Sequence, residues 1–206
     1  IWRFVTPREG LTLWVNDENR HYVYNGSAWV VLGAGKQTMQ VAAPLWTPTA
    51  SAGCAPATAI ATSAGAPDIV ALSFDASADE YASHVIRMPK SWNTGSITAS
   101  FEWAHPATTT DFDVVWGIQA VAAGAGDAIN TAYGSGVEVT DTGGTEHLLY
   151  RSSVTAPISI AATPIEYDDI FLRIYRKATD AADTMAVDAR LINVVLSYFT
   201  DALTDD

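Results

Sequence analysis

The chain has 206 residues, of which 49% are hydrophobic, so it can bury a core of its own and is not disordered by composition. It has 11 lysines and arginines against 23 aspartates and glutamates, and the net charge of −12 disfavours binding to nucleic acids and to anionic membrane surfaces. One cysteine, Cys54, excludes an intrachain disulfide, and no apolar run approaches the roughly 18 residues of a membrane span.

Residues 1–32 have the pattern of a compact three-stranded meander. Three runs rich in β-branched and aromatic residues are the predicted strands: 11–15, 21–24 and 27–32. Asn25-Gly26 predicts a two-residue hairpin turn of type I′, in which both positions need a positive φ. So small a sheet is not stable alone, and we expect its aromatic residues to pack against other copies of the chain: Trp14, Tyr24 and Trp29.

Residues 33–67 have the composition of a linker. From 47 to 67 the chain is rich in Ala, Thr, Ser, Gly and Pro, which leaves little to bury, so we expect an extended connector or a set of long loops. Within this segment, residues 41–46 are the opening edge strand of the next domain in our interpretation, because Pro44 suits an edge and not a centre.

Residues 68–206 have the pattern of an antiparallel β-sandwich. Between 97 and 103 apolar residues alternate with polar ones, which is typical of a half-buried strand, and Trp103 and Trp116 fall on predicted core faces. Helical periodicity is weak, and only 17% of the residues are charged, against about 25% in an average domain. We therefore predict a mostly β, jelly-roll-like fold with strands at 69–74, 81–88, 97–105, 113–122, 137–142, 146–152, 158–162, 170–176 and 191–199.

Catalytic motifs are missing from the sequence. It contains no Gly-rich phosphate loop, no His-Glu-x-x-His and no Gly-x-Ser-x-Gly, and its four histidines are scattered singly. Glu102 and Glu138 lie on separate predicted strands, and only their separation would show whether they form a glycosidase pair. We expect no enzymatic activity and no cofactor.

An acidic stretch before the last strand is a candidate metal site. Oxygen-rich loops can hold calcium, which takes six to eight oxygen ligands, and the three carboxylates in question are Asp180, Asp183 and Asp188. The alternative is a solvated acidic loop in which Asp183 caps a turn. We favour this alternative because the spacing matches no EF-hand loop.

Two tryptophans in predicted loops are candidate sugar-binding residues. Trp92 lies between Pro89 and Gly95, and Trp46 lies beside two prolines. Loop aromatics can stack on the apolar C–H faces of sugar rings. The alternative, which we favour for each one singly, is a plug that closes one end of the sandwich.

The N-terminal segment resembles a small module of bacteriophage tail and fibre proteins. The residues that carry the resemblance are Pro7-x-Glu9-Gly10, Leu13-Trp14-Val15-x-Asp17 and Tyr22-x-Tyr24-Asn25-Gly26-Ser27-x-Trp29-Val30. This pattern is similar to a domain of unknown function in tail proteins of alphaproteobacterial phages and gene-transfer agents, where it serves as a structural connector. The remainder resembles the C-terminal β-domain of such proteins at 88–92, 114–117 and 183–194.

The resemblance implies a location in the virion and no chemistry. It favours a tail fibre or spike protein that contacts other virion proteins and forms a homo-oligomer, most simply a trimer. Attachment to a glycan of the host surface is our hypothesis from the loop aromatics, Trp92 above all, and from the polar loops rich in Thr, Ser, Asn and Asp. A purely architectural capsid or tail decoration protein is the alternative. A polysaccharide depolymerase ranks third, since it needs two facing carboxylates.

Overall fold

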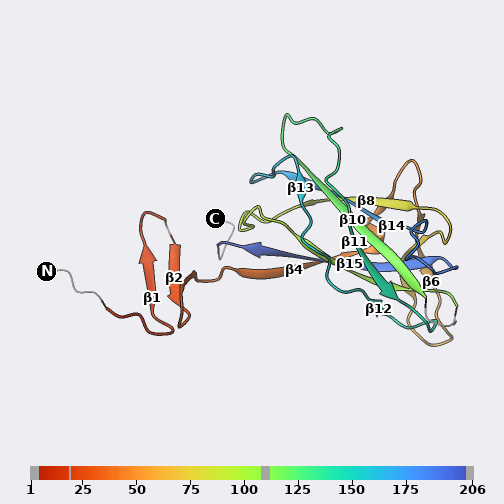
Figure 1. Ribbon diagram of the computed structural model, residues 1–206, viewed down its shortest axis with the longest axis horizontal. Coiled ribbons are helices and arrows are strands. Elements are labelled where there is room, and N and C mark those ends of the chain that lie inside the picture. The colour runs from red at the N-terminus through yellow and green to blue at the C-terminus, as the bar shows by residue number, and fades with distance from the viewer. Residues whose placement is uncertain (1–4, 19, 108–111, 203–206) are drawn as a thin grey trace.

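The computed structural model describes residues 5–18, 20–107 and 112–202. Strands make up 49% of the chain and helix 2%, and in the described residues the helix is one 3-10 turn, η1 (Ala43–Leu45). Figure 1 shows a three-stranded module standing apart from a β-sandwich, to which β4 (Gly35–Ala42) leads. The predicted mostly β fold with antiparallel sheets is confirmed.

The N-terminal module is an antiparallel meander of β1 (Thr12–Val15), β2 (Arg20–Tyr24) and β3 (Trp29–Val31). None of the described residues in these strands is buried. Trp14 is 46% and Trp29 36% exposed, although Trp29 packs against Tyr24 with 5.5 Å between ring centroids. Within one chain, therefore, the module leaves both tryptophans accessible to another protein surface.

The turn between β2 and β3 differs from the predicted two-residue hairpin. Tyr24 pairs with Trp29, so the loop has four residues, and in it Gly26 alone has a positive φ, at 95°. The side-chain Oδ1 of Asn25 accepts hydrogen bonds from the backbone N–H groups of Ser27 and Ala28, at 3.0 and 2.9 Å. Because the Asn25 side chain takes the place of a backbone acceptor, the loop is an Asx-turn and needs no second positive φ.

The sandwich consists of two six-stranded sheets. The first has the order β11-β10-β14-β8-β5 with β13 beside β10, and the second has the order β12-β9-β15-β7-β6 with β4 beside β15. The bounds of the remaining strands are β5 Thr47–Pro48, β6 Ala55–Ile60, β7 Ile69–Phe74, β8 Glu80–Arg87, β9 Thr98–Ala104, β10 Asp113–Ala123, β11 Val137–Thr142, β12 Tyr150–Arg151, β13 Ile160–Ala161, β14 Asp169–Arg176 and β15 Ala189–Thr200.

Several successive strands lie in alternate sheets, although β10, β11 and β14 all belong to the first sheet. The chain crosses from β7 to β8, back to β9, over to β10, and finally from β14 to β15. Such crossing connections are those of the predicted jelly-roll-like sandwich. The predicted strands at 146–152 and 158–162 shrink to the two-residue strands β12 and β13.

The segment predicted as a linker belongs largely to the sandwich. β4 pairs with β15 over eight residues, Gly35 to Ala42 against Thr200 to Asn193, and β6 pairs with β7. The second domain therefore starts at Gly35 and not at residue 68. Composition missed β6 because small side chains suffice at a sheet edge. It missed β4, which has long polar side chains such as Lys36 and Gln37, because the backbone pairing with β15 makes this segment a strand.

The core between the sheets is built around aromatic rings. Trp103 and Trp116 are fully buried, as predicted. Trp116 lies parallel to Phe101 with 5.6 Å between centroids and meets Phe74 edge-on at 5.2 Å. The alternation at 97–103 thus directs one face of β9 into the core.

Candidate functional site

Neither predicted sugar-binding tryptophan is available for stacking. Trp46 is 3% and Trp92 5% exposed, and both belong to the hydrophobic core. A bridge between Trp92 and Thr200 ties the β8–β9 loop to the end of β15. The predicted ligand-binding role is therefore corrected: Trp92 is buried at the end of the sandwich, as in the plug alternative, and Trp46 is buried against His84 in the middle of β8.

The three acidic residues before β15 do not form a metal site. The Asp183 carboxylate points inward and pairs with Arg176, at 2.7 Å from Nη2 and 3.0 Å from Nε. Asp180 points outward to Lys177, and Asp188 is exposed. No group of three or more His, Cys, Asp or Glu side chains in the described ranges is arranged to hold a metal ion. The metal-site hypothesis is therefore wrong, because the buried guanidinium of Arg176, and not a metal ion, pairs with Asp183. The favoured alternative is wrong in one respect, since the Asp183 side chain is buried and not solvated.

Two hollows lie side by side where β8 and β10 end and β14 begins. The first, of about 560 Å³, is here called the Phe171 hollow, and its lining includes Arg87, Asp127, Ile129, Ile165, Glu166, Tyr167, Asp169 and Phe171. The second, of about 530 Å³, is the Trp92 hollow, lined by Arg20, Lys90, Trp92, Asn93, Thr94, Glu166, Tyr167, Asp201 and Ala202. Both hollows share Glu166 and Tyr167.

Tyr167 is the exposed aromatic side chain that lines both hollows, whereas Phe199, which is also exposed, lines neither of them. Tyr167 is 59% exposed and lies on the β13–β14 loop, with the Lys90 ammonium 5.6 Å from the centroid of its ring. Hydrogen-bonding side chains line the hollows on both sides of the ring, Asp127 and Asp169 in one and Asn93 and Thr94 in the other. An apolar ring face between polar rims is an arrangement that can bind a sugar ring.

The loops that carry this end are held in unusual backbone conformations. Six non-glycine residues in the described part of the chain have a positive φ, and four of them lie here: Thr94, Ala162, Thr163 and Tyr167. Such conformations persist only where the surrounding structure enforces them, and they concentrate at functional sites. The backbone strain therefore marks the same loops as the hollows do.

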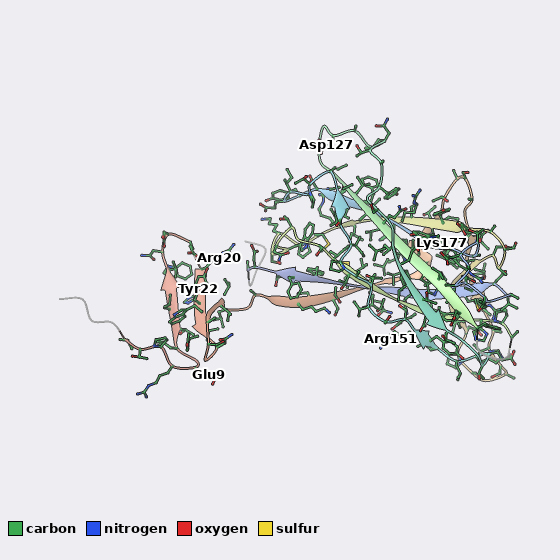
Figure 2. All side chains as sticks on the ribbon, in the orientation of Figure 1. Glu9, Arg20, Tyr22, Asp127, Arg151 and Lys177 are labelled. Carbon is green, nitrogen blue, oxygen red and sulfur yellow. The ribbon has the colours of Figure 1, made fainter. Side chains whose placement is uncertain are left out.

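Asp168 is the residue that fixes the Tyr167 loop. Its Oδ2 accepts the backbone N–H of Ile165 at 2.9 Å, and the side chain is nearly buried. A Cβ on Gly124 would lie 2.4 Å from Asp168 Oδ1, so only glycine permits the two loops to meet this closely. Figure 2 shows the following loop, with Asp127, projecting from the body of the sandwich.

The N-terminal module reaches the Trp92 hollow through one ion pair. Arg20 on β2 lies 3.1 Å from Asp201, which follows β15. In Figure 2, Arg20 lies on the side of the module nearer to the sandwich. The two parts of the chain thus both contribute to the wall of this hollow.

Sequence reasoning missed Tyr167, although a signal was present. An aromatic residue stands among Glu166, Asp168 and Asp169 between two predicted strands. This is the same criterion, an aromatic in a polar loop, that selected Trp92. The criterion does not distinguish a ring that turns into the core from one that turns outward.

The two glutamates considered for glycoside hydrolysis lie on different sheets. Glu102, on β9 of the second sheet, pairs with Arg151 and accepts a hydrogen bond from Asn193 at 2.8 Å. Glu138, on β11 of the first sheet, accepts hydrogen bonds from Tyr175 and Lys177. These two carboxylates therefore do not face each other across a groove, as a glycosidase pair would.

The described residues include no helix with the length and hydropathy of a membrane span.

A comparison with curated protein sequences gives no match. Among solved structures, the chain is similar to dimeric latent PorU from Porphyromonas gingivalis, with a TM-score of 0.36 and 10% identity over 85% of this chain. The chain spans only 14% of the length of that protein.

A second solved structure of similar shape is the carbohydrate-binding module TmCBM27, described for its specific mannan recognition. The TM-score is 0.37 and the identity 14%, over 80% of this chain and 99% of that one.

Residues 1–30 match the family described as "Protein of unknown function (DUF2793)". The segment in which the sequence resembles a domain of unknown function is therefore the one that the family model matches.

Proposed function

We propose that the protein is a glycan-binding structural component of a phage virion, of the tail fibre or spike type. The single observation that carries glycan binding is the Tyr167 ring, 59% exposed between the Phe171 and Trp92 hollows. One face of a sugar ring stacks on Tyr167, and its hydroxyl groups bond to the polar side chains around it. The virion location is supported by the resemblance of the N-terminal segment.

A neutral glycan fits this end better than an acidic one. The chain carries a net charge of −12, and Asp127, Glu166 and Asp169 lie along the two hollows. An acidic polysaccharide would be repelled at low ionic strength. We expect one shallow site to bind with a Kd of about 1 mM, near −4 kcal/mol, and several copies on one particle to strengthen attachment by about 10²–10⁴-fold.

Replacing Tyr167 with asparagine tests the binding proposal. Asparagine adopts the left-handed backbone conformation more readily than other residues, so it retains the φ of 72° while the ring is lost. We expect binding to a neutral bacterial polysaccharide, selected from a glycan array with the unaltered protein, to weaken about tenfold, which corresponds to about 1.4 kcal/mol. Thermal unfolding should stay nearly unchanged.

Val154→Asn is the matched control, because Val154 is 56% exposed and lies outside both hollows. If the Tyr167 and Val154 variants bind every glycan equally well, or if the unaltered protein binds none, glycan binding at Tyr167 is refuted. The purely architectural decoration protein then takes first place.

Oligomerisation is the second part of the proposal. We expect a homotrimer in which Trp14, Tyr24 and Trp29 pack against neighbouring copies. Trp14 and Trp29 are exposed and Tyr24 is half-buried, and exposed aromatic side chains gain most from burial between subunits. Sedimentation of the intact protein should give the mass of three chains, and the double variant Trp14→Ser/Trp29→Ser should shift it toward one chain. A stable monomer with a folded module would contradict this expectation.

A further inference from the structure

A third hollow, here called the Arg190 hollow, lies on the outer face of the second sheet. Its volume is about 190 Å³, and it lies where β9 ends and β15 begins, whereas the Trp92 hollow adjoins the end of β15. Six of its eleven lining residues are aliphatic: Ile60, Ile69, Ala104, Leu148, Leu149 and Ile192. An apolar cavity of about 150 Å³ accommodates benzene, so this hollow has room for a hydrocarbon group of that size.

A β-bulge shapes the floor of the Arg190 hollow. On β15, Leu191 pairs with Trp103 and Asn193 with Glu102, so Ile192 is an extra residue between them. The bulge lets Ile192 and Asn193 both line the hollow, although neighbours in a regular strand point to opposite faces. The Asn193 side chain donates to Glu102, at 2.8 Å, and so is already bonded.

A left-handed turn forms the opposite wall. His147 has a φ of 62°, and the two leucines that follow it are more than half exposed. They line the hollow while their other sides remain in solvent. This wall of the hollow is therefore apolar and open to solvent.

Arg190 is the unpaired cation of this hollow. Arg190 is half-buried, and its backbone pairs with Ser73 and Ala104 in the sheet. Its side chain lines the hollow and forms no hydrogen bond or ion pair with the described residues. By contrast, Arg20, Arg87, Arg151 and Arg176 are each paired with a carboxylate. Arg173 also lacks a carboxylate but donates to Gln119 Oε1 at 3.0 Å, and Arg8 is exposed in the N-terminal module. Arg190 is half-buried without such a partner among the described residues, so its guanidinium is free to pair with a carboxylate from outside.

The histidines do not supply this charge. The two ring nitrogens of His105 are occupied, because Nδ1 lies 2.8 Å from the Ala107 carbonyl and Nε2 accepts the Gly144 N–H at 3.1 Å. Burial lowers the pKa of His105, and the charge of Arg190 lowers it further. His147 lies 3.9 Å from Glu146, which offsets its charge when it is protonated. The positive charge of the hollow therefore belongs to Arg190.

We infer that the Arg190 hollow binds a carboxylate carried on a small hydrocarbon group. The carboxylate pairs with the Arg190 guanidinium, whose planar fork matches a carboxylate in two parallel hydrogen bonds. The hydrocarbon group packs against Ile69, Ile192 and Leu148. This site shares no residue with the Tyr167 end, so it stands independently of the proposed glycan binding.

Phenylacetate and phenylacetamide are the probes that test the inference. They have the same shape, and only the first is charged. In an NMR titration of the full chain, we expect phenylacetate to shift the amide signals of Arg190, Ile192 and Leu148 with a Kd of about 1 mM. Phenylacetamide should bind at least about tenfold more weakly, because it cannot form the charge-assisted pair.

Substitutions of Arg190 distinguish the contribution of its charge to ligand affinity from the contribution of the shape of the hollow. Arg190→Gln should weaken phenylacetate about tenfold and leave phenylacetamide unchanged, whereas Arg190→Lys should retain part of the preference for the acid. Arg8→Gln is the control, because it removes an exposed arginine of the N-terminal module and should leave both affinities unchanged. Thermal unfolding of each variant confirms that the fold is retained.

Equal affinities for acid and amide, or an unchanged phenylacetate affinity in Arg190→Gln, would overturn the inference. A tripeptide Gly-Gly-Phe with a free carboxyl end identifies the source of the carboxylate. If it binds as phenylacetate does, the ligand class extends to the C-terminus of a protein chain. If it does not bind while phenylacetate does, the ligand is a free small acid.

Discussion

Replacing Asp183 with alanine is expected to lower the free energy of unfolding by about 3–5 kcal/mol, because it leaves a buried guanidinium without its counter-charge. Arg176 and Asp183 have side chains that are 0% and 1% exposed. The Arg176 guanidinium donates to both carboxylate oxygens and to the backbone carbonyls of Phe74, Met185 and Val187. Those carbonyl bonds would remain, but no carboxylate would contact the guanidinium, because Asp75 and Glu80 interact with Arg176 only at longer range.

Asp180→Ala is the matched control for this prediction. Asp180 lies in the same loop, but it faces solvent and pairs with Lys177 at 3.2 Å, an exposed pair that contributes little. The free energy of unfolding of both variants in urea, measured with and without calcium, distinguishes the ion-pair explanation of Asp183 from the metal-site hypothesis. Equal losses in the two variants, or a stabilisation of the unaltered protein by calcium, would show that the buried pair is not what makes Asp183 important.

Replacing Trp92 with alanine is expected to cost about 3–5 kcal/mol of stability, the usual penalty for removing a large buried aromatic side chain. Trp92 lies in the core, and the neighbouring backbone is bonded to the end of β15, with Asn93 N–H donating to the Phe199 carbonyl at 3.0 Å. The loss of the ring opens the end of the sandwich between these two segments. Denaturant unfolding measures the effect.

Trp92→Phe is the control that keeps the plug. In the described structure the indole Nε1 of Trp92 is buried without a hydrogen-bond partner, which costs roughly 1–3 kcal/mol. Phenylalanine removes that group and refills most of the space, so we expect a much smaller loss than in Trp92→Ala. If Trp92→Ala instead keeps full stability and loses glycan binding, the plug interpretation is wrong and Trp92 is a binding residue after all.

Local patterns predicted the strands and their buried faces, because a side-chain period of two specifies a face without reference to distant residues. The alternation that ends at Trp103 became β9, and the apolar run around Trp116 became β10, with both rings in the core. The N-terminal meander was predicted for the same reason, since its strands pair with their immediate neighbours in the chain.

Long-range pairing decided what composition could not. β4, within the segment predicted as a linker, is a strand because β15, about 160 residues further on, offers it eight partners. Likewise, the direction in which the Trp92 ring turns depends on its bridge to Thr200, and no local pattern encodes such a contact. The prediction of Trp92 as a ligand residue failed for this reason.

By itself, the sequence determined the β class of this protein, the N-terminal module and the residues of its aromatic core. Only the tertiary structure decided that Asp183 pairs with a buried arginine, that Tyr167 and not Trp92 faces solvent, and that Arg190 lies without a carboxylate in an apolar hollow. The physical reason is that side chains two residues apart in a strand point to the same face, so the buried face can be read from the local sequence. The residues that surround a charged side chain or a loop aromatic come from distant segments, which meet only when the two sheets pack together.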